Sequence, residues 1–277
     1  MNKTTLAMNA LYNNMSKSEK NIADRLIANP GEVLPLSITE LAEKCGCSEA
    51  TVSRFARRLG FPGYQGLKIA LAQESGSEKI NTDLSDSDTL PDIYTKVRNN
   101  IYLTLEKTSA TKNFDALQQA AEAISSSNRI VIFGLGNSAP IALDASHKLI
   151  RAGINATSYS DSHMQAIVAS QLSEHDVAIG ISHSGSSKDI VDAIKTANNH
   201  GTTTIAVTSS GKSPLSQNAD IVLCTTSDET SRNILALSSR IAQLAIFDTI
   251  YYYLINNNEK TQEAINRTER SLIDTKY

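Results

Sequence analysis

The sequence predicts an α/β protein in which an all-helical N-terminal domain is linked to a parallel β-sheet flanked by helices. Within the first 75 residues, apolar side chains recur at helical spacing behind capping serines. From Arg129 onward, short apolar runs alternate with amphipathic segments, as in a parallel sheet with helical crossovers. Between these parts lies a stretch rich in Ser and Asp. We therefore expect an N-terminal domain at 1–75, a linker at 76–91 and an α/β domain at 92–277.

Four helices are expected in the N-terminal domain, and each is marked by the residues at its ends. Serine and threonine accept hydrogen bonds from the free N–H groups of a first turn, whereas glycine and proline end helices. The expected helices are one capped by Ser16 or Ser18 and stopped at Pro30, one capped by Ser37 or Thr39 and ended by Gly46, one capped by Ser48 and ended by Gly60, and a fourth after the turn at Pro62 and Gly63.

The C-terminal part begins with two helices and continues as a regular alternation of strands and helices. The run "RIVIFGLG" at 129–136 is apolar and rich in β-branched residues, as expected for a strand buried on both faces. Such alternation implies parallel strands joined by right-handed crossovers. We expect helices at 92–108, 113–126, 138–153, 163–172, 187–201 and 231–255, strands at 129–136, 155–161, 176–182, 202–209 and 219–225, and a charged tail at 258–277 that is compatible with a last helix.

Composition and charge limit the class of protein. The chain has 277 residues, of which 40% are hydrophobic and 20% charged, so it can bury a normal core. Its formal charge is −3, but residues 1–76 carry nine Lys and Arg against seven Asp and Glu, which makes the N-terminal domain mildly basic. We find no signal peptide and no apolar stretch long enough to span a membrane. We therefore expect a cytoplasmic protein without a membrane partner.

The three cysteines give no indication of a metal or a cofactor. Cys45 and Cys47 form C-G-C rather than C-x-x-C, and no histidine follows them at the spacing of zinc ligands. Reduced thiols, Cys224 included, are the simpler interpretation for a protein of a reducing cytosol. We expect neither a metal site nor a cofactor.

The expected helix at 48–60 has one apolar face and one basic face. At about 100° per residue, Val52, Phe55, Ala56 and Leu59 fall within one arc, the spacing of a core-facing stripe. The opposite face has three arginines and no acid, since the helix's one acid, Glu49, lies in its first turn. The outward-facing residues are Ala50, Thr51, Arg54, Arg57 and Arg58.

Together with the preceding helix, this segment is typical of a helix-turn-helix. The tight turn "CGC" joins the two short helices, and the second one is basic on its outer face. Arginine offers a planar fork to phosphates and guanine edges, and small residues at the helix start allow close approach to a groove. The alternative is a helical bundle with a solvated basic face, because short patterns of this kind also occur by chance. The candidate DNA-binding residues are Lys44, Ser48, Ala50, Thr51, Arg54, Arg57 and Arg58.

Two loops that follow expected strands are rich in glycine and serine. "GLGNSAP" at 134–140 follows the first strand, and "SHSGSSKD" at 182–189 follows the third. In open α/β sheets, ligands bind beyond the carboxyl ends of the strands, at a switch point of the strand order. Each loop also opens a helix, so its N–H groups and hydroxyls would converge on one anion, for which phosphate is the best fit.

Two other interpretations of these loops stay open. The segment "GLGNSA" also fits the dinucleotide pattern G-x-G-x-x-A, with Asp161 as a ribose ligand, but this accounts only for the first loop. The serines could instead cap helices, with Ser186 or Ser187 as the N-cap. A sugar phosphate accounts for both loops.

Taken together, these stretches resemble a known family. "GLGNSAPIALDASHKLIRAG" at 134–153 and the stretch at 181–223, which begins "ISHSGSSKDIVDAIK", look like a sugar isomerase (SIS) domain. "ITELAEKCGCSEATVSRFARRLGFPGYQGLK" at 38–68 resembles the helix-turn-helix of RpiR-type bacterial transcription regulators. The two resemblances cover nearly the whole chain, in the order that this family uses.

The resemblance implies a DNA-binding regulator whose SIS domain senses a phosphorylated sugar. The usual loop pattern S-G-x-T-x-E reads S-G-S-S-K-D here, so serine keeps the hydroxyl of threonine, while Asp189 is one methylene shorter than the usual glutamate. The resemblance also places His163 and Glu229 beside the sugar. The alternatives are that His163 is a surface or capping residue and that Glu229 stabilises the N-terminus of the helix that follows it. The candidate ligand-binding residues are Asn137, Ser138, His163, Ser182, Ser184, Ser187 and Glu229.

SIS domains also occur in isomerases and deaminating synthases, so catalysis is the alternative function. Glu229 with His163 could supply the base that aldose–ketose isomerisation needs. No second feature supports catalysis, and the N-terminal domain would be unexplained, so we expect binding without turnover. The expected partners are double-stranded operator DNA, a phosphorylated sugar such as N-acetylmannosamine 6-phosphate, and a second copy of the chain in a homodimer or higher homo-oligomer that acts as a repressor.

Overall fold

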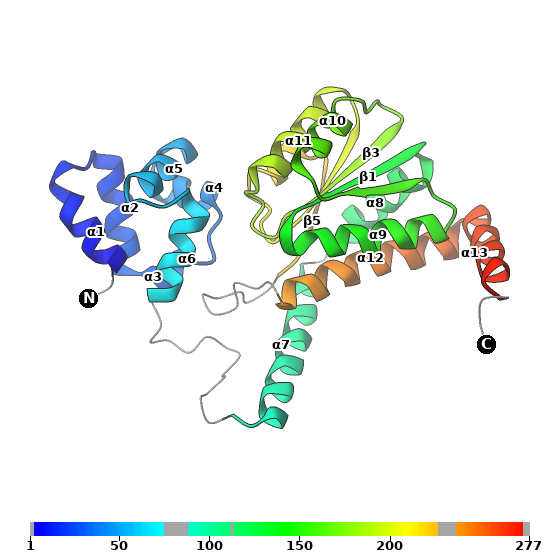
Figure 1. The fold of residues 1–277 in the computed structure, drawn as a ribbon, viewed down its shortest axis with the longest axis horizontal. Coiled ribbons are helices and arrows are strands. Elements are labelled where there is room, and N and C mark those ends of the chain that lie inside the picture. Colours follow the sequence, from blue (N-terminus) through cyan, green and yellow to red (C-terminus); the bar gives the residue numbers. More distant parts are fainter. Residues whose placement is uncertain (1–2, 75–87, 112–113, 227–236, 274–277) are drawn as a thin grey trace. The chain divides into compact units, whose positions relative to one another are not determined.

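The structure, a computed structural model, describes residues 3–74, 88–111, 114–226 and 237–273. These residues form two compact units, an N-terminal helical unit and an α/β unit (Figure 1). Among the described helices, none combines the length and apolar character that crossing a membrane requires. Glu229, one of the expected ligand contacts, lies outside the described residues.

The helices of the N-terminal unit begin where capping residues allow. Ser16 and Ser37 each accept a hydrogen bond from the backbone N–H three residues on. In return, the carboxylates of Glu19 and Glu40 accept a hydrogen bond from the backbone N–H of the capping serine. These two capping boxes decide between the alternative caps that the sequence left open. The four expected helices are confirmed, and α1 and α3 are additional. The helices are α1 (Lys3–Leu11), α2 (Lys17–Ala28), α3 (Pro30–Val33), α4 (Ile38–Cys45), α5 (Glu49–Arg58) and α6 (Tyr64–Glu74), with a 3-10 turn at Tyr12–Asn14.

The α/β unit contains one five-stranded sheet, and all of its strand pairs are parallel. The strand order is β2-β1-β3-β4-β5, so the direction of winding reverses between β1 and β3. The expected α/β fold with helices on both faces is therefore confirmed. The strands are β1 (Arg129–Gly134), β2 (Ala156–Tyr159), β3 (Asp176–Ile181), β4 (Thr203–Thr208) and β5 (Ile221–Cys224); the helices are α8 (Phe114–Ser126), α9 (Ala139–Arg151), α10 (Ser162–Ala169), α11 (Lys188–Asn199), α12 (Leu237–Asn257) and α13 (Glu259–Leu272). Helix α7 (Leu90–Ala110) is divided between the two units, with its residues up to Thr104 in the N-terminal unit.

Two apolar layers hold the sheet between its helices. Helices α8, α9 and α12 cover one face of the sheet, and α10 and α11 cover the other (Figure 1). Ile132 and Ile179 pack with the first group of helices, and Val131 and Phe133 pack with the second group. Alternate residues of one buried strand thus serve both layers, which explains the uniformly apolar runs in the sequence. Gly180 lets α11 approach closely, because a Cβ there would lie 2.7 Å from Ile194 Cγ1.

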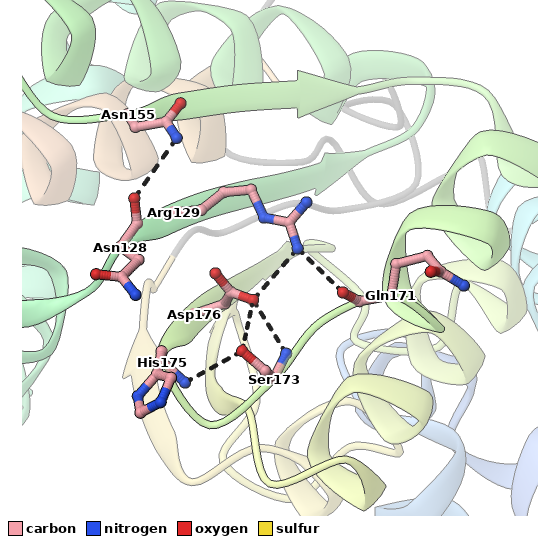
Figure 2. Close-up of polar contacts among 7 residues, drawn as sticks. All are labelled: Asn128, Arg129, Asn155, Gln171, Ser173, His175 and Asp176. Atoms are coloured by element: carbon pink, nitrogen blue, oxygen red, sulfur yellow. Dashed lines mark hydrogen bonds and ion pairs between the residues drawn. The ribbon is translucent and has the colours of Figure 1, made fainter.

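At the amino edge of the sheet, a buried carboxylate ties β1 to β3 (Figure 2). Asp176 accepts hydrogen bonds from the backbone N–H and the hydroxyl of Ser173, both at 3.0 Å, and from Arg129 at 3.2 Å. Arg129 also donates to the carbonyl of Gln171. Burial alone would raise the pKa of Asp176, but the guanidinium and the Ser173 donors lower it below its usual range.

The last helix, α13, holds the far end of α9. The hydroxyl of Thr268 donates to the carbonyl of Arg151, and the guanidinium of Arg151 pairs with Glu269. Gly153, with φ of 77°, leaves room for Ala264, whose Cβ would lie 2.6 Å from a Cβ at position 153. Helix α9 is therefore anchored at its carboxyl end by α13.

Candidate functional site

The two serine-rich loops leave the sheet side by side. Gly134, the last residue of β1, is paired with Ile181, the last residue of β3. Residues 135–138 and 182–187 therefore start at the same level of the carboxyl edge, at the point where the strand order reverses. Helix α9 follows the first loop on one face of the sheet, and α11 follows the second loop on the other face. This is the crevice in which open α/β sheets bind ligands.

The first loop turns immediately after β1, and two glycines allow it. A Cβ at Gly134 would lie 2.6 Å from the carbonyl oxygen of Ser138, so only glycine fits. Gly136 has a φ of 54°, in the left-handed region. The N–H of Ser138 donates a hydrogen bond to the carbonyl of Leu135 at 3.0 Å and closes a 3-10 turn. Asn137 is exposed and Ser138 is half-buried at the start of α9, where its side chain makes no capping hydrogen bond.

The second loop is held in place by the neighbouring strand. The N–H of Ser182 donates to the carbonyl of Val207, and the carbonyl of His183 accepts from both the N–H and the hydroxyl of Ser209. Gly185, with φ of 62°, permits the turn. These contacts fix the backbone of the loop to β4 and to the residue that follows it.

The hydroxyls of the second loop face one another. Ser182, which is 3% exposed, and Ser187 lie 3.0 Å apart between their Oγ atoms. Ser187 is the N-cap residue of α11, but its side chain makes no capping bond, because the hydroxyl is directed to Ser182. Ser184 accepts a hydrogen bond from the N–H of Ser186 at 3.3 Å. The interpretation of these serines as helix caps alone is therefore wrong for the Ser187 side chain.

The electrostatics of the two loops come from dipoles rather than from charged side chains. Residues 135–138 and 182–187 contain no Asp, Glu, Lys or Arg. Both α9 and α11 begin at these loops, and the N-terminus of a helix carries a partial positive charge. Among the described residues, no three His, Cys, Asp or Glu side chains are placed to hold a metal ion. Hydroxyls and N–H groups at two helix starts suit a phosphate.

Three further residues lie at the start of the helix that follows β2. Asp161 caps α10 by accepting a hydrogen bond from the N–H of Met164 at 2.9 Å. The carboxylate considered as a ribose ligand is therefore used as a cap. His163 lies exposed in the first turn of α10. Gln165, which our reading of the sequence did not single out, is fully buried and donates to the carbonyls of Gly134 and Tyr159.

In the N-terminal unit, α4 and α5 form the expected helix-turn-helix. Gly46 ends α4 in the left-handed conformation, and Ser48 caps α5 by accepting from the N–H of Thr51. The hydroxyl of Thr39 donates to Glu49 at 2.5 Å, so the one acid of α5 is directed towards α4. The residues expected in the core lie there: Val52, Phe55 and Ala56 are fully buried, and Leu59 is half-buried.

The outer face of this helix pair is basic. Lys44, Ser48, Ala50, Arg54 and Arg57 are exposed, and Thr51 is half-buried.

Arg58 differs from the other arginines of α5, because its guanidinium is engaged within the unit. It pairs with Glu19 at 2.9 Å and donates to the carbonyl of Asn14 at 2.8 Å. Burial would raise the pKa of Glu19, but the Ser16 N–H and Arg58 lower it below its usual range. Arg58 thus fastens α5 to α2.

Two family descriptions match separate parts of the chain. The helix-turn-helix domain of the rpiR family matches residues 3–78, and the SIS domain matches residues 123–252. Among solved structures, NanR of Vibrio vulnificus, complexed with ManNAc-6P, has a TM-score of 0.85 at 24% identity over 99% of this chain and 100% of that one. The sugar isomerase domain of an RpiR transcription factor from Sphaerobacter thermophilus has a TM-score of 0.56 at 24% identity, over 66% of this chain and 99% of that one. These likenesses establish the fold.

Relatives in sequence establish the family. An uncharacterized HTH-type transcriptional regulator of Caldanaerobacter subterraneus is 38% identical over 87% of this chain and 86% of its own length. Similar regulators of Haemophilus influenzae and Thermotoga maritima are 33% and 31% identical, over 90% and 96% of this chain and 89% and 96% of their own lengths. The chain, with its helix-turn-helix and its SIS domain, therefore belongs to the RpiR family of HTH-type transcriptional regulators.

Proposed function

We propose that this regulator binds operator DNA through α5 and that a phosphorylated sugar, held without turnover between the two serine-rich loops, controls this binding. The observation that carries the proposal is the pairing of Gly134 with Ile181, which starts both loops at one level of the sheet edge. The donors there are uncharged hydroxyls and the N–H groups of two helix starts, a combination that suits the phosphate of a small metabolite. In this proposal Asn137, Ser138, Ser182, Ser184 and Ser187 contact the phosphate, and His163 and Glu229 contact the sugar.

The choice of sugar rests on a solved structure of similar fold. NanR of Vibrio vulnificus was determined in complex with ManNAc-6P. Residues 135–138 and 182–187 contain no Asp, Glu, Lys or Arg, which agrees with a ligand whose only strong charge is its phosphate. We therefore propose N-acetylmannosamine 6-phosphate or a related amino-sugar phosphate as the effector.

The DNA side of the proposal uses the exposed basic residues of the helix-turn-helix. Arg54, Arg57 and Lys44 would contact phosphates or guanine edges, and Ser48, Ala50 and Thr51 would allow close approach at the start of α5. Arg58 would contribute less, since it is paired with Glu19. A homodimer would present two copies of α5 to successive major grooves about 34 Å apart.

Successive parts of the chain have different roles in this proposal. We assign residues 1–75 to DNA binding, 76–91 to the linker and 92–277 to effector binding. Repression that the sugar relieves is the form of control that we propose. Coupling between two such sites typically amounts to about 1–3 kcal/mol, or roughly 5- to 150-fold in DNA affinity.

A thermal-shift screen tests the effector. Purified protein is heated with N-acetylmannosamine 6-phosphate, glucosamine 6-phosphate, glucose 6-phosphate and ribose 5-phosphate, because a ligand that binds the native state raises Tm. At 100 times Kd, the stabilisation is about 2.7 kcal/mol. Ser184→Ala is the matched variant and should lose the shift. If no phosphosugar raises Tm, the proposed effector site is refuted.

The same phosphosugars also test for catalysis. NMR spectra of each compound, incubated with the protein, should show no new sugar signals. Turnover of any of them would establish the isomerase alternative in place of binding alone.

A further inference from the structure

Gln165 occupies the end of the hydrogen-bond ladder between β1 and β2. Its side chain is fully buried, and Nε2 donates to the carbonyl of Tyr159 at 2.8 Å and to that of Gly134 at 3.4 Å. These carbonyls belong to the last residues of β2 and β1. Where the backbone pairing stops, the amide group therefore supplies the donors that a further rung of the ladder would have supplied.

The orientation of this amide follows from its partners. Rotating it by 180° would set Oε1 against two carbonyl oxygens, so the nitrogen must face the strand ends. The oxygen makes no hydrogen bond within the described residues. An apolar side chain of the same length would avoid burying that oxygen, so what glutamine adds at this position is its N–H donors.

Through Gly134, the amide acts on the first serine-rich loop. On one side the Gly134 carbonyl accepts a hydrogen bond from Gln165, and on the other a Cβ at Gly134 would lie 2.6 Å from the carbonyl oxygen of Ser138. Gln165 also belongs to the same short helix, α10, as His163, two residues earlier. One buried side chain thus connects the helix that carries His163 to the loop that carries Ser138.

We propose that Gln165 is a positioning residue of the effector site, which sets the first loop relative to the start of α10. The inference rests on the proposed function, because it assumes that Ser138 and His163 contact the sugar phosphate. Gln165 itself, being buried beneath the loop, acts through Gly134 rather than through contact with the sugar.

A double-mutant cycle tests this role. The probe is the tightest-binding member of the panel of N-acetylmannosamine 6-phosphate, glucosamine 6-phosphate, glucose 6-phosphate and ribose 5-phosphate, with Kd measured by calorimetry. Gln165→Met keeps the length of the side chain and removes its donors, and we expect Kd to rise about tenfold. With Ser138→Ala, the combined loss should be clearly less than the product of the two single losses, whereas with Ser187→Ala, on the other loop, the losses should multiply.

The control is Arg129→Met, which perturbs the opposite end of the same strand. It should lower Tm and leave Kd unchanged, which separates positioning from a general loss of stability. If Gln165→Met does not yield folded protein, Gln165→Asn, whose amide is one methylene too short, replaces it with the same expected result.

Two outcomes overturn the inference while leaving the proposed function intact. One is an unchanged Kd in the Gln165 variant, and the other is a loss that multiplies equally with Ser138→Ala and Ser187→Ala. If the wild-type protein binds no member of the panel, the proposed function and this inference fall together.

Discussion

Replacing Gly134 by alanine displaces the start of the first loop, and the structure gives the distance by which the loop must move. The added Cβ would lie 2.6 Å from the carbonyl oxygen and 2.9 Å from the carbonyl carbon of Ser138. Ordinary contacts begin near 3.4 Å, and the obstacle is backbone, so the loop must retreat by roughly 0.8 Å. Overpacking of this kind costs about 1–3 kcal/mol. Because Ser138 moves with the loop, a hydrogen bond to phosphate near 2.8 Å would be stretched beyond its useful range.

The assay combines thermal unfolding with calorimetric titration of N-acetylmannosamine 6-phosphate and the other phosphosugars of the panel. Gly134→Ala should lower Tm by roughly 2–4 °C for each kcal/mol and weaken effector binding about tenfold or more. Gly153→Ala is the matched control, since its Cβ would meet Ala264 at 2.6 Å and its φ is 77°, but it lies at the opposite end of α9. It should lower Tm without changing Kd. Wild-type affinity in Gly134→Ala, or equal losses of affinity in both variants, would refute the reasoning.

Three further predictions concern DNA binding, acid stability and the effector response. Arg57→Ala should reduce the slope of log K for operator binding against log salt concentration by about 0.9, as measured by fluorescence anisotropy. Arg58→Ala breaks the pair with Glu19 and should mainly lower Tm. Equal changes in slope for the two variants would contradict this distinction. The pKa of Asp176 is lower in the folded than in the unfolded protein, so its contribution to the free energy of unfolding is present above pH of about 4 and is lost as pH falls through the folded pKa. Asp176→Asn should therefore lower the free energy of unfolding by about 1–2 kcal/mol at pH 7 and weaken its dependence on pH on the acid side. Urea titrations at several pH values measure this, and the same acid-side pH dependence in variant and wild type would contradict the prediction. Ser184→Ala should bind operator DNA normally yet no longer respond to the phosphosugar, and a full response would remove that hydroxyl from the site.

Local chemistry explains why the main elements were predictable. Ser48 marks the start of α5 and Gly46 marks the end of α4, in each case through hydrogen bonds to residues nearby in the sequence. The information that places these helix ends is therefore local and can be recognised in the sequence. The buried strands were equally clear, because a strand that contributes to two apolar layers, as β1 does, has no polar positions in its interior.

Contacts between residues distant in sequence explain what could not be predicted. Arg58 shares its face of the helical wheel with Arg54, but Glu19, 39 residues earlier, pairs with it only after folding. Gln165 looks like a polar residue on an amphipathic helix, and its role becomes visible only when α10 covers the end of the ladder. The serine hydroxyls of the second loop could equally have been caps, and the 3.0 Å contact between Ser182 and Ser187 depends on the turn at Gly185.

The grip of α13 on α9 has a mechanical consequence. Helix α9 starts directly after Ser138 and is 13 residues long, so it is a strut of about 20 Å whose far end is clamped at Arg151. A helix that is held at its far end passes on a displacement of its near end instead of tilting freely. Trimming the chain before α13 would therefore leave the carboxyl end of α9 unsupported, and we expect it to lower Tm.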